Sequence, residues 1–479
     1  MIRQRLNLSA GPASVGGLCL LLATVMGCRV GPTFQTPVAT PRPAFNGAPT
    51  EPVSDAQAFL QERPVPERWW TAFNCPELDR RIEAALSHSP TVASAQAALR
   101  RARESAVAAG AGRYPTVDAT GNATRARAEL EPGSPGAFVY TTYGASLSVS
   151  YTLDLFGGIR SGAEAAAAGA EFQRWLLEGT YLSLAGNVAA ATFQEAGLGS
   201  QLEVAEAVAN LLQEQEQLTA RQTEIGVKTQ ADLLAVRTQA AAARAALPPL
   251  RKALEAVRNQ LALYLGEPVA AGATRPVQLK DLTLPRELPL SLPSTVVRRR
   301  PDVRAAEAQL RAATAQVGVA AAQLLPQITL GAAYGYQNGA PGGLFQGANS
   351  VWNVGLNLLQ PIFHGGALRA QKRAAEATLD QQRADYRQTV LAAFADVSNA
   401  LDALRFDAQA EQASAEAEAA ASQSLALEKD QYGLGAASYL QLLDATRAWD
   451  QARIGLITAR SNRLADSAAL YAALGGGWK

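Results

Sequence analysis

Histidine and cysteine are scarce in this chain, which holds His88, His364 and the cysteines Cys19, Cys28 and Cys75. These few residues leave little material for a metal cluster or a cysteine–histidine nucleophilic pair. No glycine-rich dinucleotide fingerprint follows a strand-like run, and no P-loop or G-x-S-x-G elbow occurs. We therefore expect neither an enzyme nor a bound cofactor. An excess of one charge is missing too, with 43 basic against 42 acidic residues, so we expect no nucleic-acid surface.

Residues 1–27 have the pattern of a lipoprotein signal peptide. Arg3 and Arg5 form a basic start, an apolar stretch runs from Val15 to Met26, and Gly27-Cys28 ends it. The stretch is too short to cross a bilayer as a mature helix. A small residue followed by cysteine at the end of an apolar stretch is typical of a lipoprotein cleavage site. We therefore expect cleavage before Cys28 and a covalent lipid on its thiol. Several acyl chains would anchor the protein stably. The alternative is an ordinary secretory signal with an incidental cysteine.

The mature chain begins with a proline-rich stretch, residues 28–68, that we expect to be an extended tether. An aromatic cluster from Trp69 to Phe73 then marks the entry into packed structure. Cys19 is lost with the signal peptide, so Cys75 is the one mature thiol apart from the lipidated Cys28. A structural disulfide within one protomer is therefore excluded.

The rest of the chain is a tandem duplication. The run that starts at Pro90 resembles the run that starts at Pro301, and in each copy the next proline follows 25 residues later, at 115 and 326. Gly226 pairs with Gly433 at an offset of 207 residues, and Leu233 pairs with Leu440 at the same offset. The sequence predicts a first repeat at 77–265, a proline-rich linker at 266–293, a second repeat at 294–474 and a short tail at 475–479.

Each repeat contains helix-like segments, two of them very long. We expect first helices at about 77–110 and 294–323, long helices at 159–224 and 365–432, and return helices at 230–265 and 438–474. A helix of the long kind measures on the order of 100 Å. Apolar residues such as Val390, Phe394 and Val397 recur with heptad spacing, although Glu195 interrupts the equivalent series in the first repeat. This spacing predicts left-handed coiled coils.

Between these helices lie runs that alternate between apolar and small polar residues. We expect strands at about 143–153, 327–337 and 351–359, which carry no charge within the alternating runs, and a less regular strand at about 116–127. Strands of this length and period fit a tilted membrane-spanning sheet, although any one of them alone would also fit a soluble sandwich. Four strands cannot close a barrel, and an open edge is not viable in lipid. We therefore expect three copies and twelve strands.

Several motifs carry a family resemblance. They are Gly27-Cys28-Arg29-Val30-Gly31-Pro32, Trp69-Trp70-Thr71-Ala72-Phe73, Arg300-Pro301-Asp302-Val303-Arg304, Tyr439-Leu440-Gln441-Leu442-Leu443-Asp444 and Ala473-Leu474-Gly475-Gly476-Gly477-Trp478. Together they resemble the lipoprotein branch of the TolC-like outer membrane factors, the NodT type. The resemblance implies an α+β membrane protein. A homotrimer would form a twelve-stranded outer-membrane β-barrel and a periplasmic coiled-coil α-barrel. It also implies a periplasmic adaptor and an inner-membrane transporter of the resistance–nodulation–division class as partners.

The resemblance further implies where the channel closes and docks. Tyr432, Asp444 and Arg447 match the family's pattern at the periplasmic gate, with Asp444 forming a single acidic ring and bonding Arg447 between protomers. The alternative for Asp444 and Arg447 is a solvated pair on one helix. Both Gly226 and Gly433 are expected at reversals with positive φ. These two glycines, with Val227 and Leu434, are the expected adaptor-docking tips.

The function that the sequence favours is an outer-membrane exit duct of a tripartite efflux pump. The duct is anchored by lipid and extends far into the periplasm. Two other functions remain open on the same architecture. One is a duct for protein secretion of the type I kind, and the other is a coiled-coil lipoprotein scaffold that transports nothing.

Overall fold

A computed structural model describes residues 29–36, 57–61, 65–129, 137–269, 275–290 and 293–476. The expected signal peptide, Cys28 and most of the expected tether lie outside these residues. The chain divides into two compact units. The first comprises residues 1–37, 99–172 and 306–386, and the second comprises residues 38–98, 173–305 and 387–479. Each is described by itself below.

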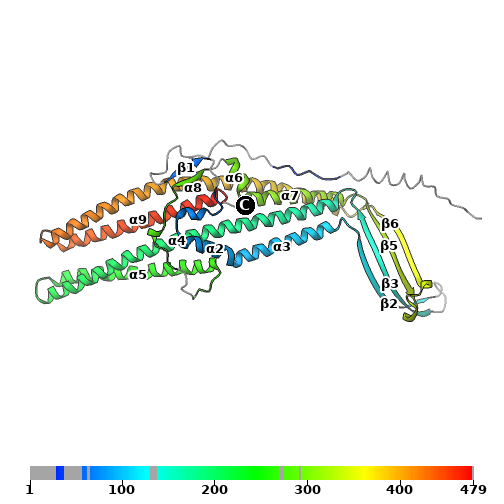
Figure 1. Cartoon of the computed structure of the whole chain (residues 1–479), viewed down its shortest axis with the longest axis horizontal. Helices are drawn as coiled ribbons and strands as arrows, with labels where there is room; N and C mark the ends of the chain where they lie inside the picture. The colour runs from blue at the N-terminus through cyan, green and yellow to red at the C-terminus, as the bar shows by residue number, and fades with distance from the viewer. Residues whose placement is uncertain are drawn as a thin grey trace, which may run out of the picture. The chain divides into compact units, whose positions relative to one another are not determined.

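A four-stranded antiparallel sheet dominates the first unit (Figure 1). Its strands are β2 (Thr116–Glu129), β3 (Ala137–Leu153), β5 (Gln327–Asn338) and β6 (Ser350–Leu359), in the order β2-β3-β5-β6. Two 3₁₀ turns, η3 (Pro341–Gly343) and η4 (Gly347–Asn349), lie between β5 and β6. β3 starts at Ala137 rather than at 143, because Phe138, Val139 and Tyr140 favour a strand and pair with β2 residues 126–128. β2 likewise extends past 127 and carries charges at its far end.

The register of the sheet separates an apolar face from a polar face. Val149 pairs with Val117 on one side and with Ala332 on the other, and Ala332 pairs with Val354. One residue further, Ser148 pairs with Asp118. Because side chains alternate between the faces of a strand, the first row belongs to an apolar surface and the second to a hydrated one.

Residues 29–36 pack onto helices of the first unit. The Arg29 guanidinium pairs with Glu164 at 2.6 Å, and the Val30 amide donates to the Phe156 carbonyl at 3.1 Å. Gly31 lies so close to the backbone of Gly318 that a Cβ there would come within 2.7 Å of the Gly318 Cα. The segment expected to be an extended tether is therefore docked at its start.

The shorter helices correct two of the expected boundaries. In place of one helix at 77–110 the chain forms α2 (Pro76–His88) and α3 (Pro90–Ala111). In place of one helix at 294–323 it forms α6 (Pro293–Arg299) and α7 (Pro301–Ala322). The prolines explain both breaks, because the residue before a proline avoids the helical region; Ser89 has φ −61° and ψ 127°.

The long helices are α4 (Gly158–Glu224) and α8 (Ala367–Gly433), each 67 residues, and they return as α5 (Gln230–Leu265) and α9 (Tyr439–Ala473). At 1.5 Å per residue, α4 and α8 are each about 100 Å long. α8 starts after the expected residue 365, because Gly365 and Gly366 both have positive φ. In the described parts of the chain, every helix is too short or too polar to qualify as a membrane-spanning helix.

The core of the second unit joins segments that the sequence suggested were linkers. β1 (Ala58–Gln61) pairs in parallel with β4 (Glu287–Leu290), so the tether and the 266–293 linker each contribute a strand. Beside them lie two 3₁₀ helices, η1 (Trp69–Phe73) and η2 (Leu279–Asp281). Trp69 stacks on Tyr471 with 5.5 Å between ring centroids, and Phe73 lies 4.8 Å from Phe193. The thiol of Cys75 is buried and free in this core, and burial raises its pKa.

Candidate functional site

The tips of the two helical hairpins are built alike. The Val227 amide donates to the Gln222 carbonyl, and the Ala436 amide donates to the Gln431 carbonyl, both at 2.8 Å. These six-to-one bonds close Schellman motifs around Gly226 (φ 77°) and Gly435 (φ 74°). The return helices then begin with equivalent caps, in which Thr229 accepts from the Asp232 amide and Ser438 from the Gln441 amide.

This geometry corrects two expectations about Gly433. Gly433 is the last residue of α8, and the left-handed position is Gly435. The two tips therefore correspond at an offset of 209 residues, not 207. The same offset relates the first residues of α4 and α8, Gly158 and Ala367. Gly226 and Gly433 match as residue types, but the residue that takes the positive φ needed to reverse the second hairpin is Gly435.

The expected docking residues lie on these tips and are exposed. Val227 is 65 % exposed, Leu434 is 85 % exposed, and Ile225 beside them is 75 % exposed. A Cβ at Gly226 or Gly433 would meet open space. Each tip thus presents apolar side chains to water at a well-defined turn. Such a surface is suited to contact with another protein.

The expected gate residues lie on the second hairpin, next to its tip. The Arg447 guanidinium is 3.7 Å from the Asp444 carboxylate one turn earlier on α9, and both side chains are largely exposed. Tyr432 contacts Tyr439, with 5.7 Å between ring centroids, rather than Asp444. Burial, followed by the neighbouring Tyr432, raises the pKa of Tyr439 to about 12. Within one protomer, Asp444 and Arg447 form the solvated pair that the sequence left open as an alternative.

An apolar cluster sets the orientation of the gate residues. Leu443, adjacent to Asp444, is buried together with Leu212 of α4 and Ala240 of α5. Tyr439 packs against the same cluster. Because Leu443 faces these helices, Asp444 points to a different side of α9. The first hairpin therefore supports the second close to the gate.

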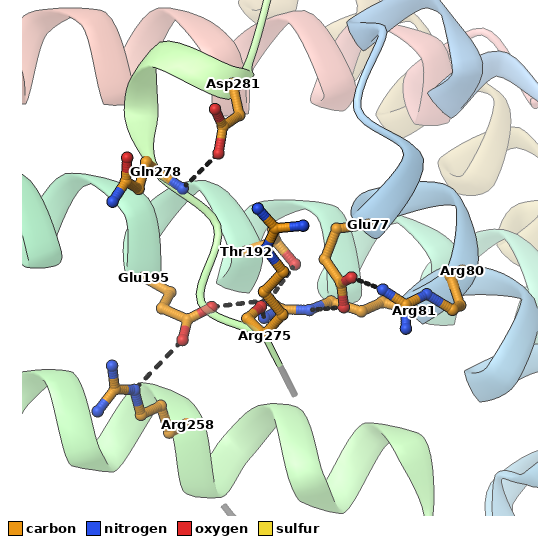
Figure 2. A network of polar contacts seen from close by, with 9 residues as sticks. All are labelled: Glu77, Arg80, Arg81, Thr192, Glu195, Arg258, Arg275, Gln278 and Asp281. Atoms are coloured by element: carbon orange, nitrogen blue, oxygen red, sulfur yellow. Dashed lines mark hydrogen bonds and ion pairs between the residues drawn. The ribbon is translucent and has the colours of Figure 1, made fainter. Parts of the chain in front are cut away.

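Deeper in the second unit, a buried charge network joins α2, α4 and α5 (Figure 2). Arg81 of α2 is 1 % exposed and donates to Glu195 of α4 at 2.7 Å, to Thr192 at 3.3 Å and to the Arg275 carbonyl at 2.8 Å. The other Glu195 oxygen accepts from Arg258 of α5 at 3.2 Å. A buried ion pair is stable only with this degree of hydrogen bonding.

A second polar cluster lies between α8 and α9. Arg463 donates to Glu411 at 2.8 Å and to Gln57 at 2.9 Å. Burial, followed by the nearby Asp466, raises the pKa of Asp407 to about 7. Sequence reasoning missed both clusters, although Glu195 had broken the heptad pattern. Among the described residues, histidine, cysteine and carboxylate side chains form no group that could hold a metal ion.

Comparisons with known proteins agree with this architecture. The family model described as outer membrane efflux protein matches residues 81–267 and 292–476, one block in each repeat. The chain is 35 % identical to the pyoverdine export outer membrane protein OpmQ of Pseudomonas putida over 96 % of this chain and 97 % of that protein. It is 31 % identical to the probable efflux pump outer membrane protein TtgC of the same species, covering 94 % and 93 %.

Solved structures share the fold. The outer-membrane channel OprN superposes with a TM-score of 0.85 at 29 % identity, covering 94 % of this chain and all of that chain. The open state of the MtrE outer membrane channel of Neisseria gonorrhoeae superposes with a TM-score of 0.82 at 28 % identity, covering 94 % and 98 %. These are the trimeric channels, with a β-barrel and a helical tunnel, whose fold the sequence led us to expect.

Proposed function

The chain belongs to the outer membrane efflux protein family, and we propose that it is the passive exit duct of a tripartite pump of the resistance–nodulation–division class. It is an outer-membrane efflux protein with a long periplasmic tunnel. The family is one of channels, and we propose that this member catalyses no reaction. The observation that carries the proposal is the pairing of an apolar-faced, four-stranded sheet with two long helical hairpins in one chain.

The proposed partners are a periplasmic adaptor and an inner-membrane transporter. Support comes from the exposed Val227 and Leu434 at the two hairpin tips, since a trimer would present six such apolar tips. Cross-linking from Val227→Cys or Leu434→Cys to adaptor hairpins in membranes tests the docking. A pump that still exports its substrates while both positions fail to cross-link would exclude tip-to-tip docking.

Channel activity is tested with the purified full chain in planar lipid bilayers. We expect discrete conductance steps, and we expect deletion of the gene to sensitise cells to pump substrates. A scaffold that transports nothing would give no conductance. Exported polypeptide rather than small molecules in the medium would instead identify a secretion duct.

We propose that Cys28 carries the lipid. The docked residues 29–36 support this, because Arg29 and Val30 fix the chain beside Phe156, directly after β3. Labelling with a radioactive fatty acid should mark the wild type and leave Cys28→Ser unmarked. Equal labelling of the two proteins would refute the assignment. Activity need not vanish in the variant, since the barrel can insert without the lipid.

The proposed gate is a ring of three Asp444 carboxylates held by Arg447 of neighbouring copies. The exposure of both side chains supports it, because each is free to reach beyond its own helix. A charge-assisted bond of this kind is stronger than a neutral one. Asp444→Ala with Arg447→Ala should raise single-channel conductance and admit large antibiotics. Arg237→Ala on the first hairpin is the matched control, and conductance equal to wild type in the double variant would place the constriction elsewhere.

A further inference from the structure

The apolar face of the sheet has a defined height. The row that contains Val149 runs along β3 from Leu153 to Tyr143, and its partners on β5 run from Ile328 to Asn338. Ten residues along a strand span about 33 Å, or about 25 Å across a membrane at a strand tilt of about 40°. This is the height of the apolar band on an outer-membrane sheet. The face of Val149 is therefore the outward face, in contact with lipid.

Aromatic side chains mark the end of this band that lies away from the helices. On the outward face Tyr334 pairs with Trp352, and Tyr336 follows two residues further along β5. Tyr143 pairs with Asn338, the last residue of β5. Aromatic residues of this kind gather at the boundary between hydrocarbon and headgroups. Because the helical tunnel is periplasmic, this boundary belongs to the outer leaflet of the membrane.

Beyond Tyr143 the two faces of the hairpin exchange their chemistry. The outward face of β2 now carries Arg125, Arg127 and Glu129, all exposed, since every second residue shares a face. The side chains of β3 that face inward at this level are aromatic rather than small and polar, and they belong to Phe138 and Tyr140, with ring centroids 5.6 Å apart. Such an inversion is expected where the outward face leaves hydrocarbon for a polar layer.

The two arginines lie at two different levels of that polar layer. Arg125 pairs with Thr141, two residues beyond Tyr143, which places it about 5 Å above the aromatic boundary. Arg127 lies another two residues on, about 10 Å above the boundary. The headgroup layer of an ordinary bilayer is about 5–8 Å thick on each side. Arg127 is therefore at or beyond the limit of a phospholipid headgroup.

Both guanidinium groups are available for a ligand. Among the residues that the structure describes, neither Arg125 nor Arg127 has an acidic side chain within ion-pair distance. Glu129 is the one acidic residue on this row of β2, so the row keeps a net positive charge. An arginine presents parallel N–H donors that match the oxygens of a phosphate group.

We propose that Arg125 and Arg127 bind the phosphate groups of a glycolipid in the outer leaflet, one whose headgroup is a phosphorylated sugar. A sugar headgroup is deep enough to present phosphate at the levels of both arginines, whereas a phospholipid presents its phosphate close to the boundary alone. The proposal rests on the outer-membrane placement of the sheet. It gives the far end of β2 a lipid-binding role that is separate from the channel.

A fluorescent label tests the outward placement of the row. Arg125→Cys and Thr124→Cys change neighbouring residues of β2 that face opposite sides. In proteoliposomes that contain a phospholipid with a nitroxide headgroup, a label on Arg125→Cys should be quenched and a label on Thr124→Cys should be spared. Cys75 is buried, so the native thiol should take up little label. Equal quenching of the two variants would refute the outward placement.

Lipid titration of the detergent-solubilised full chain, followed by native mass spectrometry, tests the ligand. Bis-phosphorylated lipid A should bind the wild type more tightly than phosphatidylglycerol does. Arg125→Gln and Arg127→Gln should each raise the apparent dissociation constant of lipid A about fivefold, because one arginine near a charged lipid surface contributes about 1 kcal/mol. Arg101→Gln is the matched control, since it removes an exposed arginine from α3, and it should change nothing.

Two outcomes would overturn the proposal. Equal binding of lipid A and phosphatidylglycerol by the wild type would make an ordinary phospholipid the occupant. A loss in Arg101→Gln as large as that in Arg125→Gln would show that lipid A responds to overall charge and not to this row. Bilayer conductance of the same variants tests the proposed function separately, because we expect the double variant of Arg125 and Arg127 to conduct like the wild type.

Discussion

Position 195 of α4 holds a glutamate buried between two arginines, whereas the equivalent position of α8 holds Leu404 in an apolar core. Arg258, which completes the network of the first repeat, corresponds to Ser467 in the second. The neighbouring layer shows the reverse. Asp407, Glu411, Arg463 and Asp466 of the second repeat correspond to Leu198, Leu202, Leu254 and Val257 of the first. Each repeat thus carries charged side chains at positions where the other has mostly apolar ones.

The difference shows what duplication preserved and what diverged. The two hairpins share one backbone frame, by which we mean the lengths of their long helices, the geometry of their turns and the caps of their return helices. The polar layers differ, and a buried charge is tolerated only opposite its own partners. A polar layer in a coiled coil specifies register and partner choice. The layers therefore make the two hairpins non-interchangeable within a common frame.

The largest expected effect comes from removing the charged layer of the first repeat. Arg81→Ala leaves Glu195 and Glu77 without their buried partner and should lower the free energy of unfolding by about 3–5 kcal/mol. Arg81→Met combined with Glu195→Leu gives position 195 the leucine found at the equivalent position of the second repeat. This double variant should recover most of the lost free energy of unfolding. Urea unfolding in detergent measures both variants. If the combined variant is as unstable as Arg81→Ala, the instability does not come from leaving Glu195 without its charged partner.

The next effect concerns the charged layer of the second repeat. Burial raises the folded-state pKa of Asp407 to about 7, above its ordinary value. The free energy of unfolding should therefore fall as the pH rises from about 4 through 7, because ionisation is easier in the unfolded chain. The fall is at most about 1.4 kcal/mol for each pH unit, and screening by solvent at this half-buried carboxyl makes it smaller. Asp407→Asn should flatten this slope, whereas Leu198→Asn, at the equivalent site of the first repeat, should leave the slope in place. An unchanged slope in Asp407→Asn would assign the pH dependence to other groups.

The smallest effect tests the frame that the repeats share. Gly226→Ala and Gly435→Ala should each cost about 1–2 kcal/mol, because both positions have positive φ. Gly433→Ala should instead be neutral or stabilising by up to about 1 kcal/mol, since Gly433 is helical. Thermal denaturation of the three variants compares them directly. If Gly433→Ala lowers the stability as much as Gly435→Ala does, Gly433 would be the equivalent of Gly226 after all, at the offset of 207 residues.

Periodicity carried most of the fold prediction, and its failures have physical causes. The heptad and two-residue periods led to the long helices and the membrane strands, because each period reflects one face of a local element. The helix expected at 77–110 ignored the effect of Pro90 on Ser89. β1 was missed because four residues pair with a segment more than 200 positions away. Turn chemistry led to the hairpin turn at Gly226, but it placed the second turn at Gly433 instead of Gly435. The partners of Arg81 are set by packing between distant segments, which no local pattern reveals.

The docked segment at residues 29–36 has a consequence for the order of events during biogenesis. Its contacts include Glu164 and Phe156 in the first repeat, but also Gly318 in the second, and Arg311 lies 5.0 Å from the centroid of the Phe34 ring. These contacts cannot be complete until the second repeat has been synthesised. Residues 29–36 are thus among the first described parts of the chain to be translated, yet they complete their contacts only after the second repeat is made. Until then they are open to any factor that processes or carries the chain, and their docking marks a protomer whose two halves have met.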